Sequence, residues 1–119
     1  MTLHDFLEDQ RLSRAWLRQG NLEVYVRKGV RSFREHTGDT LTIADIQMRV
    51  LDEVSKAEFE VWFDDAEKLA RERGLSVAFE GIGGWPWMVE FLALRHFVRS
   101  SDPDFKAQVD AFRPHRTSL

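Results

Sequence analysis

The sequence contains no cysteine. Disulfides and thiolate-ligated zinc sites are therefore excluded, and nothing in the sequence requires an oxidising compartment. No apolar run approaches the roughly 20 residues that a membrane-spanning helix needs. Acidic residues interrupt the segment Met1–Gln10 in a way that signal peptides do not show. We therefore expect a cytoplasmic protein with no membrane partner.

Clustered positive charge is also scarce. The 119 residues carry a formal net charge of −3, and their basic residues form two small clusters, around Arg27 and around Arg113. Nucleic-acid binding generally needs larger arrays of Lys and Arg, so we expect no nucleic-acid partner. The four histidines are scattered without the spacing of a metal site, and we expect no metal.

The overall composition is typical of one folded domain, and we expect that domain to span residues 1–119. Apolar residues make up 43% of the chain and charged residues of both signs make up 31%. This balance supports a hydrophobic core with a solvated surface. No internal repeat and no linker-like stretch divides the chain.

Hydrophobic periodicity predicts both helix and strand in the N-terminal half. Helical spacing indicates one helix, or two short ones, ending at Gly20. Alternation from Leu22 predicts a strand that continues past Gly29 to Phe33, and the segment 36–39 has the composition of a turn.

The next predicted strand, 41–48, is irregular. Its apolar phase slips by one residue between Ile43 and Ile46. A β-bulge across Ala44-Asp45 would keep both isoleucines in the core. A strand that ends early is the alternative.

The strongest helical signal follows this strand. A capping box formed by Ser55 and Glu58 is predicted to start the helix, and Gly74 to close it. The apolar stripe of this helix comprises Phe59, Trp62, Phe63, Ala66, Leu69 and Ala70.

The C-terminal part is predicted to continue with a strand over 75–79, a glycine-rich turn over 81–84 and a helix that starts at Pro86. The expected buried side of that helix comprises Val89, Leu92, Ala93 and His96. A short strand is expected at Phe97 and Val98. Residues 100–119 are expected to form a C-terminal helix and tail, with Phe105, Val109 and Phe112 on one stripe.

From Asn21 to about Arg99, this order of elements resembles small bacterial and phage proteins of the GNAT (N-acetyltransferase) superfamily. The segments that carry the resemblance are 21–27, 41–48, 59–70 and 77–97. The resemblance implies an α+β fold, with a mostly antiparallel, twisted central sheet flanked by helices and truncated at the N-terminus. A homodimer could cover the sheet edge that such a truncation exposes.

In that family the bulged strand splays from its neighbour, and acetyl-CoA lies in the opening. Backbone amides at the start of the next helix hold the pyrophosphate, because free N–H groups and the helix dipole favour an anion. The positions here that match the family's cofactor-binding residues are Ile46, Met48, Val54, Ser55, Lys56 and Ala57.

The cofactor loop departs from the family's Arg/Gln-x-x-Gly-x-Gly/Ala pattern. No glycine lies between Gly38 and Gly74, and Asp52 and Glu53 stand where basic residues are usual. A capping box at Ser55 would also occupy amides that a pyrophosphate needs. We therefore expect acetyl-CoA to bind poorly or not at all.

The family's other motif positions are also changed. Trp85 stands where the family has Asn, and Phe97 stands where a Tyr often acts as general acid. Glu80 and His96 are the candidate catalytic groups that remain. The spacing of His96 favours a packed or capping role over a catalytic one. A carboxylate at a strand end, such as Glu80, more often bonds to the adjacent turn.

Trp85 and Trp87, which flank Pro86, are candidates for partner binding because tryptophan is common at interface hot spots. Packing against the core is the alternative role for both. We therefore predict an acetyltransferase-fold protein that is catalytically degenerate and acts by binding a protein partner, for example as a phage-type modulator of a host protein. The alternatives are an acetyl-CoA-dependent N-acetyltransferase acting on a small-molecule or protein amine, and a small α+β domain unrelated to GNAT proteins.

Overall fold

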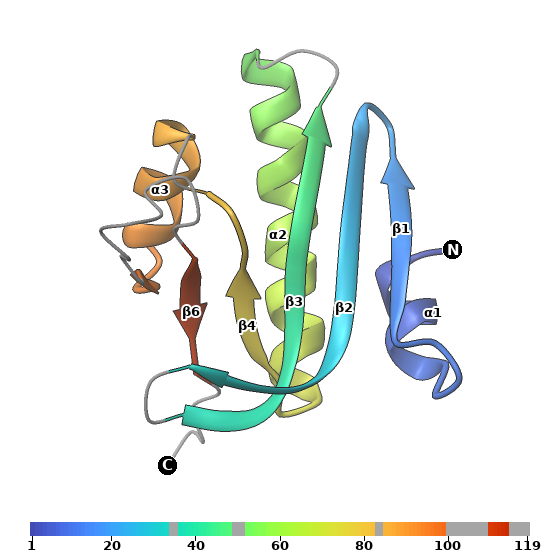
Figure 1. Cartoon of the computed structure of the whole chain (residues 1–119). Helices are drawn as coiled ribbons and strands as arrows, with labels where there is room; N and C mark the ends of the chain where they lie inside the picture. The colour runs from blue at the N-terminus through green and yellow to red at the C-terminus, as the bar shows by residue number, and fades with distance from the viewer. Residues whose placement is uncertain (34–35, 49–51, 83–84, 100–109, 115–119) are drawn as a thin grey trace.

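The computed structural model describes residues 1–33, 36–48, 52–82, 85–99 and 110–114 (Figure 1). In these residues the chain is an α+β domain. Its elements are α1 (Leu3–Glu8), β1 (Arg14–Gln19), β2 (Leu22–Phe33), β3 (His36–Met48), α2 (Glu53–Glu72), β4 (Ser76–Phe79), α3 (Pro86–Ala93), β5 (Val98–Arg99) and β6 (Ala111–Arg113). Neither α1, α2 nor α3 is long and apolar enough to cross a membrane.

The strands form one mixed sheet in the order β1-β2-β3-β4-β6-β5. β3 and β4 are parallel, and the other neighbouring strands are antiparallel. All three helices pack into one core cluster on one face of the sheet, together with inward residues of the strands. A smaller cluster of Phe33, Ala78 and Phe112 lies apart from it, where the far end of the β2–β3 hairpin bends across the sheet (Figure 1).

The N-terminal segment is where the helical prediction was wrong. Only Leu3–Glu8 is helical, and Arg14–Gln19 forms the edge strand β1. Gly20 has a φ of +60°, a conformation that serves a helix end and a tight hairpin turn equally well. The glycine signal therefore could not distinguish the two structures. In the strand, Leu17 is buried while Trp16 is 51% exposed on the opposite face.

The β2–β3 hairpin confirms the predicted bulge. Tyr25 pairs with Asp45, whereas the next residue, Val26, pairs with Ile43, so Ala44 is the extra residue. The turn predicted at 36–39 is wrong, because these residues continue the ladder opposite 30–33. The polar residues and the glycine of this segment have the composition of a turn, although the backbone is extended.

The parallel pair β3–β4 is short. It covers Thr40–Ile43 and Ser76–Phe79, and the Glu80 amide adds one more hydrogen bond to the Ile43 carbonyl at 3.0 Å. β3 then continues to Met48, while the chain after β4 turns away towards α3 (Figure 1). The two central strands therefore diverge directly after Ile43, where the bulge begins.

Helix α2 begins one turn earlier than its predicted capping box. Asp52 is the N-cap, and its carboxylate accepts from the Ser55 amide at 2.8 Å. Ser55 lies inside the first turn and is buried. Asp52 and Ser55 are both suitable caps in sequence, so the pattern alone could not choose between them. The predicted end is confirmed: Gly74 has a φ of +66°, and the Leu75 amide reaches back to the Ala70 carbonyl at 2.9 Å.

The C-terminal part differs from the prediction in two respects. The buried side of α3 is formed by Met88, Phe91 and Leu92, while Ala93 and His96 are exposed. Phe112 belongs to β6 and not to a helix; its ring stacks on that of Phe33 at 4.8 Å. The other positions of the predicted terminal helix, Phe105 and Val109, lie outside the described residues.

Candidate functional site

The beginning of α2 is the position where the resemblance places a pyrophosphate. The Asp52 carboxylate accepts a hydrogen bond from the Ser55 amide. Hydrogen bonds from Ser55 lower the pKa of Asp52, so this carboxyl group is anionic at neutral pH. Lys56 lies 3.4 Å from the carboxylate of Glu53. The positive end of the helix and Lys56 therefore already have anionic partners within the chain. A pyrophosphate fits this set of groups poorly, because it would meet two carboxylates.

The predicted cofactor-binding residues do not share one surface. Val54 and Ala57 are exposed on the side of α2 that faces the β1–β2 turn. The Lys56 ammonium lies 5.6 Å from the centre of the Trp87 ring, on the side of α3. Ser55 is buried, and the half-buried Ile46 and Met48 follow the bulge in β3 and pack against the core.

Aromatic rings fill the space between α2 and α3. The Trp87 ring lies 5.8 Å from Phe59 and 5.3 Å from Phe91, measured between centroids, and 6.0 Å from Trp85. Both tryptophans are half-buried and pack against the core cluster. Each of the two rings thus contributes to packing and keeps part of its surface exposed.

Glu80 lies on the sheet face opposite the helices. Its carboxylate pairs with the guanidinium of Arg27 and, at 2.8 Å, with that of Arg31. Arg31 also pairs with Asp110 at 3.1 Å, and Asp110 accepts from the Gly81 amide at 3.0 Å. Among the described residues of the turn, the Gly81 amide bonds to Asp110, while the Glu80 carboxylate pairs with the two arginines. Two guanidinium groups occupy the oxygens that a general base would use.

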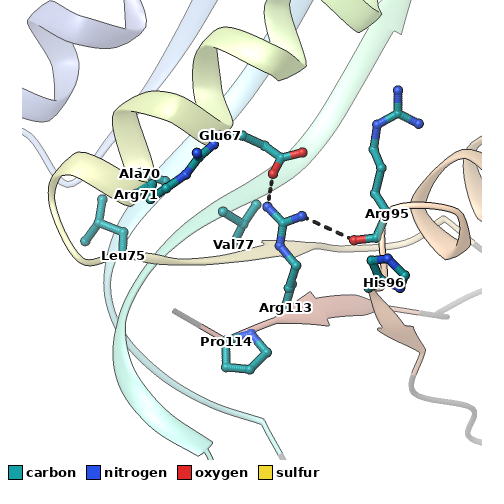
Figure 2. Close-up of a pocket in the computed structure, with 9 residues that line it drawn as sticks. All are labelled: Glu67, Ala70, Arg71, Leu75, Val77, Arg95, His96, Arg113 and Pro114. Atoms are coloured by element: carbon teal, nitrogen blue, oxygen red, sulfur yellow. Dashed lines mark hydrogen bonds and ion pairs between the residues drawn. The ribbon is translucent and has the colours of Figure 1, made fainter. Parts of the chain in front are cut away.

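His96 lies just beyond α3 with a φ of +66°, which is uncommon for a residue other than glycine. It is exposed, so the packed alternative is wrong. The capping alternative is confirmed: the Phe97 amide donates to the Leu92 carbonyl and the His96 amide to the Ala93 carbonyl, each at 3.1 Å, as in a Schellman cap. It lines a cavity of about 240 Å³ between α2, β4 and β6 (Figure 2). Arg113 lies centrally there, paired with Glu67 and donating to the Arg95 carbonyl at 3.2 Å. This cavity is on the helical face, so the structure does not bring His96 and Glu80 together.

A larger cavity, of about 580 Å³, lies between the first half of α2 and the β1–β2 turn. Its described lining residues are Gln19, Gly20, Glu53, Val54, Ala57, Glu58 and Val61. Val54 and Val61 are each 64% exposed. The sequence contained one signal for this surface, the i, i+3, i+7 spacing of Val54, Ala57 and Val61. The signal was missed because the cavity also needs β1, which was predicted to be helical.

Comparisons with protein-family models, with curated proteins and with solved structures find no match for this chain. Among the residues that the structure describes, no group of His, Asp and Glu side chains is arranged to hold a metal ion. Any functional conclusion therefore depends on the geometry of the chain itself.

Proposed function

We propose that this chain is an acetyltransferase-fold protein of the GNAT type that does not transfer acetyl groups and acts by binding another protein. Three features support the fold assignment. The strand before the long helix has its bulge at Ala44, the parallel pair diverges directly after Ile43, and α2 follows the bulged strand. These are the features that the resemblance led us to expect around a cofactor opening.

The observation that carries the proposed loss of acetyl transfer is the Asp52 cap. A cofactor pyrophosphate needs the first amides of the helix and a positive potential around them. Here the Asp52 carboxylate accepts the hydrogen bond of the Ser55 amide, and Glu53 adds a second negative charge in the same turn. The Ser55 amide is therefore already satisfied, and two carboxylates lie at the positive end of the helix.

The candidate catalytic groups support the same proposal. Glu80 is clamped between Arg27 and Arg31, and His96 lies on the other face of the sheet. Phe97 is buried, with a relative exposure of 6%, and has no proton to give to a thiolate. No pair of these groups converges on one reacting centre.

Exposed apolar side chains support binding to a protein. Val54 and Val61 lie on one side of α2 and are each 64% exposed, and Trp85 and Trp87 keep part of their surface accessible. Apolar and aromatic groups of this kind provide the anchors of protein interfaces.

Calorimetric titration of the full chain with acetyl-CoA tests the loss of cofactor binding. We expect no saturable heat at about 1 mM cofactor. Saturation with a dissociation constant of roughly micromolar size would instead favour an acetyl-CoA-dependent N-acetyltransferase with a divergent loop.

Site-specific photo-crosslinking tests the binding half of the proposal. A photo-reactive residue in place of Val61 should give a discrete crosslinked protein in the natural host. The same residue in place of Asp64, which is exposed on the same helix but outside the large cavity, is the matched control. Equal, diffuse labelling from both positions would contradict partner binding through this side of α2.

A further inference from the structure

The cavity between α2 and the β1–β2 turn has an apolar wall. Val54, Ala57 and Val61 lie three and four residues apart, so they follow one side of the helix. Single exposed apolar residues are ordinary on protein surfaces. Here three of them border an open depression of about 580 Å³ on the surface.

The same cavity is acidic. Glu53 and Glu58 are among its lining residues, and none of the described lining residues is Lys or Arg. Glu53 is 3.4 Å from Lys56, which moderates its charge. Glu58 has no such partner among the described residues, so the cavity presents a negative group beside an apolar wall.

The Glu58 carboxylate also has an oxygen that is unsatisfied. Its Oε2 is buried and accepts no hydrogen bond from the described residues. A buried acceptor without a donor is destabilising. Gly20 lies directly opposite, where a Cβ atom would stand 3.3 Å from this oxygen. The backbone of Gly20 therefore packs directly against the Glu58 carboxylate, and an added side chain would crowd it.

We infer that this cavity receives a Lys or Arg side chain of the protein partner, with a neighbouring apolar side chain packed on Val54, Ala57 and Val61. The inference rests on the proposed function, because it presumes a protein partner. Charge complementarity selects the occupant: a cation would offset the negative charges of Glu53 and Glu58 in the lining, whereas an acidic segment would be repelled by them.

Hexylammonium is a minimal probe for this chemistry, because it joins one cation to one apolar chain. Titration of the isotope-labelled full chain should shift the NMR amide signals of Gly20, Val54 and Val61. Hexanoate, with the opposite charge, and hexanol, with no charge, are the matched probes. We expect hexylammonium to bind more tightly than hexanoate by on the order of tenfold. Equal affinity, or shifts elsewhere in the molecule, would overturn the inference.

Glu58→Gln should remove the preference for the cation while keeping the shape of the side chain. Asp64→Asn makes the same change of charge on an exposed face of α2 outside the cavity and should leave the preference intact. If Glu58→Gln fails to fold, Val61→Thr serves instead, because Val61 is exposed. It should weaken hexylammonium binding severalfold, and unchanged binding would count against the apolar wall.

Selection of displayed random peptides on the full chain extends the test to protein segments. The expected consensus places Lys or Arg next to an apolar residue and is lost on the Glu58→Gln chain. An acidic consensus would overturn the inference. The outcome is separable from the proposed function: acetyl-CoA binding would refute the latter, whereas the cavity's preference for a cation would stand or fall by these titrations.

Discussion

The two sides of helix α2 are built differently. On the side towards α3, Phe59 and Phe63 are fully buried and contact the ring of Phe91 at 5.3 and 5.2 Å between centroids. On the side towards β1, Val54 and Val61 are 64% exposed around an open cavity. One helix therefore carries a closely packed aromatic core on one side and an unfilled apolar surface on the other.

This difference separates stability from recognition. Aromatic rings packed edge to face contribute burial and a further favourable interaction, so the α3 side accounts for much of the fold's stability. Val54 and Val61 on the β1 side bury little, and an unpaired carboxylate oxygen of Glu58 lies beside them. Substitutions on the two sides should accordingly have different consequences.

The largest effect is expected from Phe63→Ala, which removes a fully buried ring on the α3 side. We expect it to lower the free energy of unfolding by about 3–5 kcal/mol, because it removes burial and leaves a cavity. Chemical denaturation monitored by circular dichroism measures this change. A loss below about 1 kcal/mol would show that the α3 side is not the stabilising one.

Trp87→Ala should have an intermediate effect. The ring is half-buried between Phe59 and Phe91, so its removal should cost about 2 kcal/mol, less than a fully buried aromatic residue. The same denaturation experiment tests it. Unchanged stability would mean that Trp87 does not pack as a core residue and is available to a partner.

Gly20→Ala tests the junction between the β1–β2 turn and α2. The new Cβ would be strained at a φ of +60° and would approach the Glu58 carboxylate at 3.3 Å. We expect a loss of about 1–2 kcal/mol. Gly38→Ala is the control, because Gly38 has no atom within 4 Å of the added Cβ and no positive φ. Equal losses for both substitutions would contradict the proposed close approach.

The smallest effect is expected from Val61→Thr on the β1 side. This nearly isosteric change at an exposed position should alter the free energy of unfolding by less than about 0.5 kcal/mol. Val77→Thr, at a position that is 4% exposed, should cost clearly more because it buries a hydroxyl. If Val61→Thr were the more destabilising of the two, the β1 side would be part of the core.

Much of the fold could be predicted from local sequence patterns. The bulge at Ala44, the end of α2 at Gly74 and the start of α3 at Pro86 each depend on a few neighbouring residues. Strand β1 and strand β6 could not be predicted in this way. Strand β1 forms by pairing with β2 across the turn at Gly20, and the sequence of that turn suits a helix end equally well. Strand β6 forms by pairing with β4, which is distant in the sequence.

The candidate site shows the same limit. The missing glycines and the acidic residues at the start of α2 were visible in sequence, although the capping residue proved to be Asp52 and not Ser55. The ion pairs of Glu80 and the exposure of His96 depend on contacts across the sheet and on one backbone angle. The cavity beside Glu58 depends on where Gly20 lies, and no local pattern indicates that position.

A parallel NMR titration of the labelled chain with acetyl-CoA and with hexylammonium tests the central claim most directly. The account predicts that acetyl-CoA at about 1 mM leaves the amide signals of Ser55 and Lys56 unchanged. It predicts that hexylammonium shifts those of Gly20, Val54 and Val61. Saturable shifts of Ser55 and Lys56 with acetyl-CoA, with no response of Gly20 to hexylammonium, would contradict it.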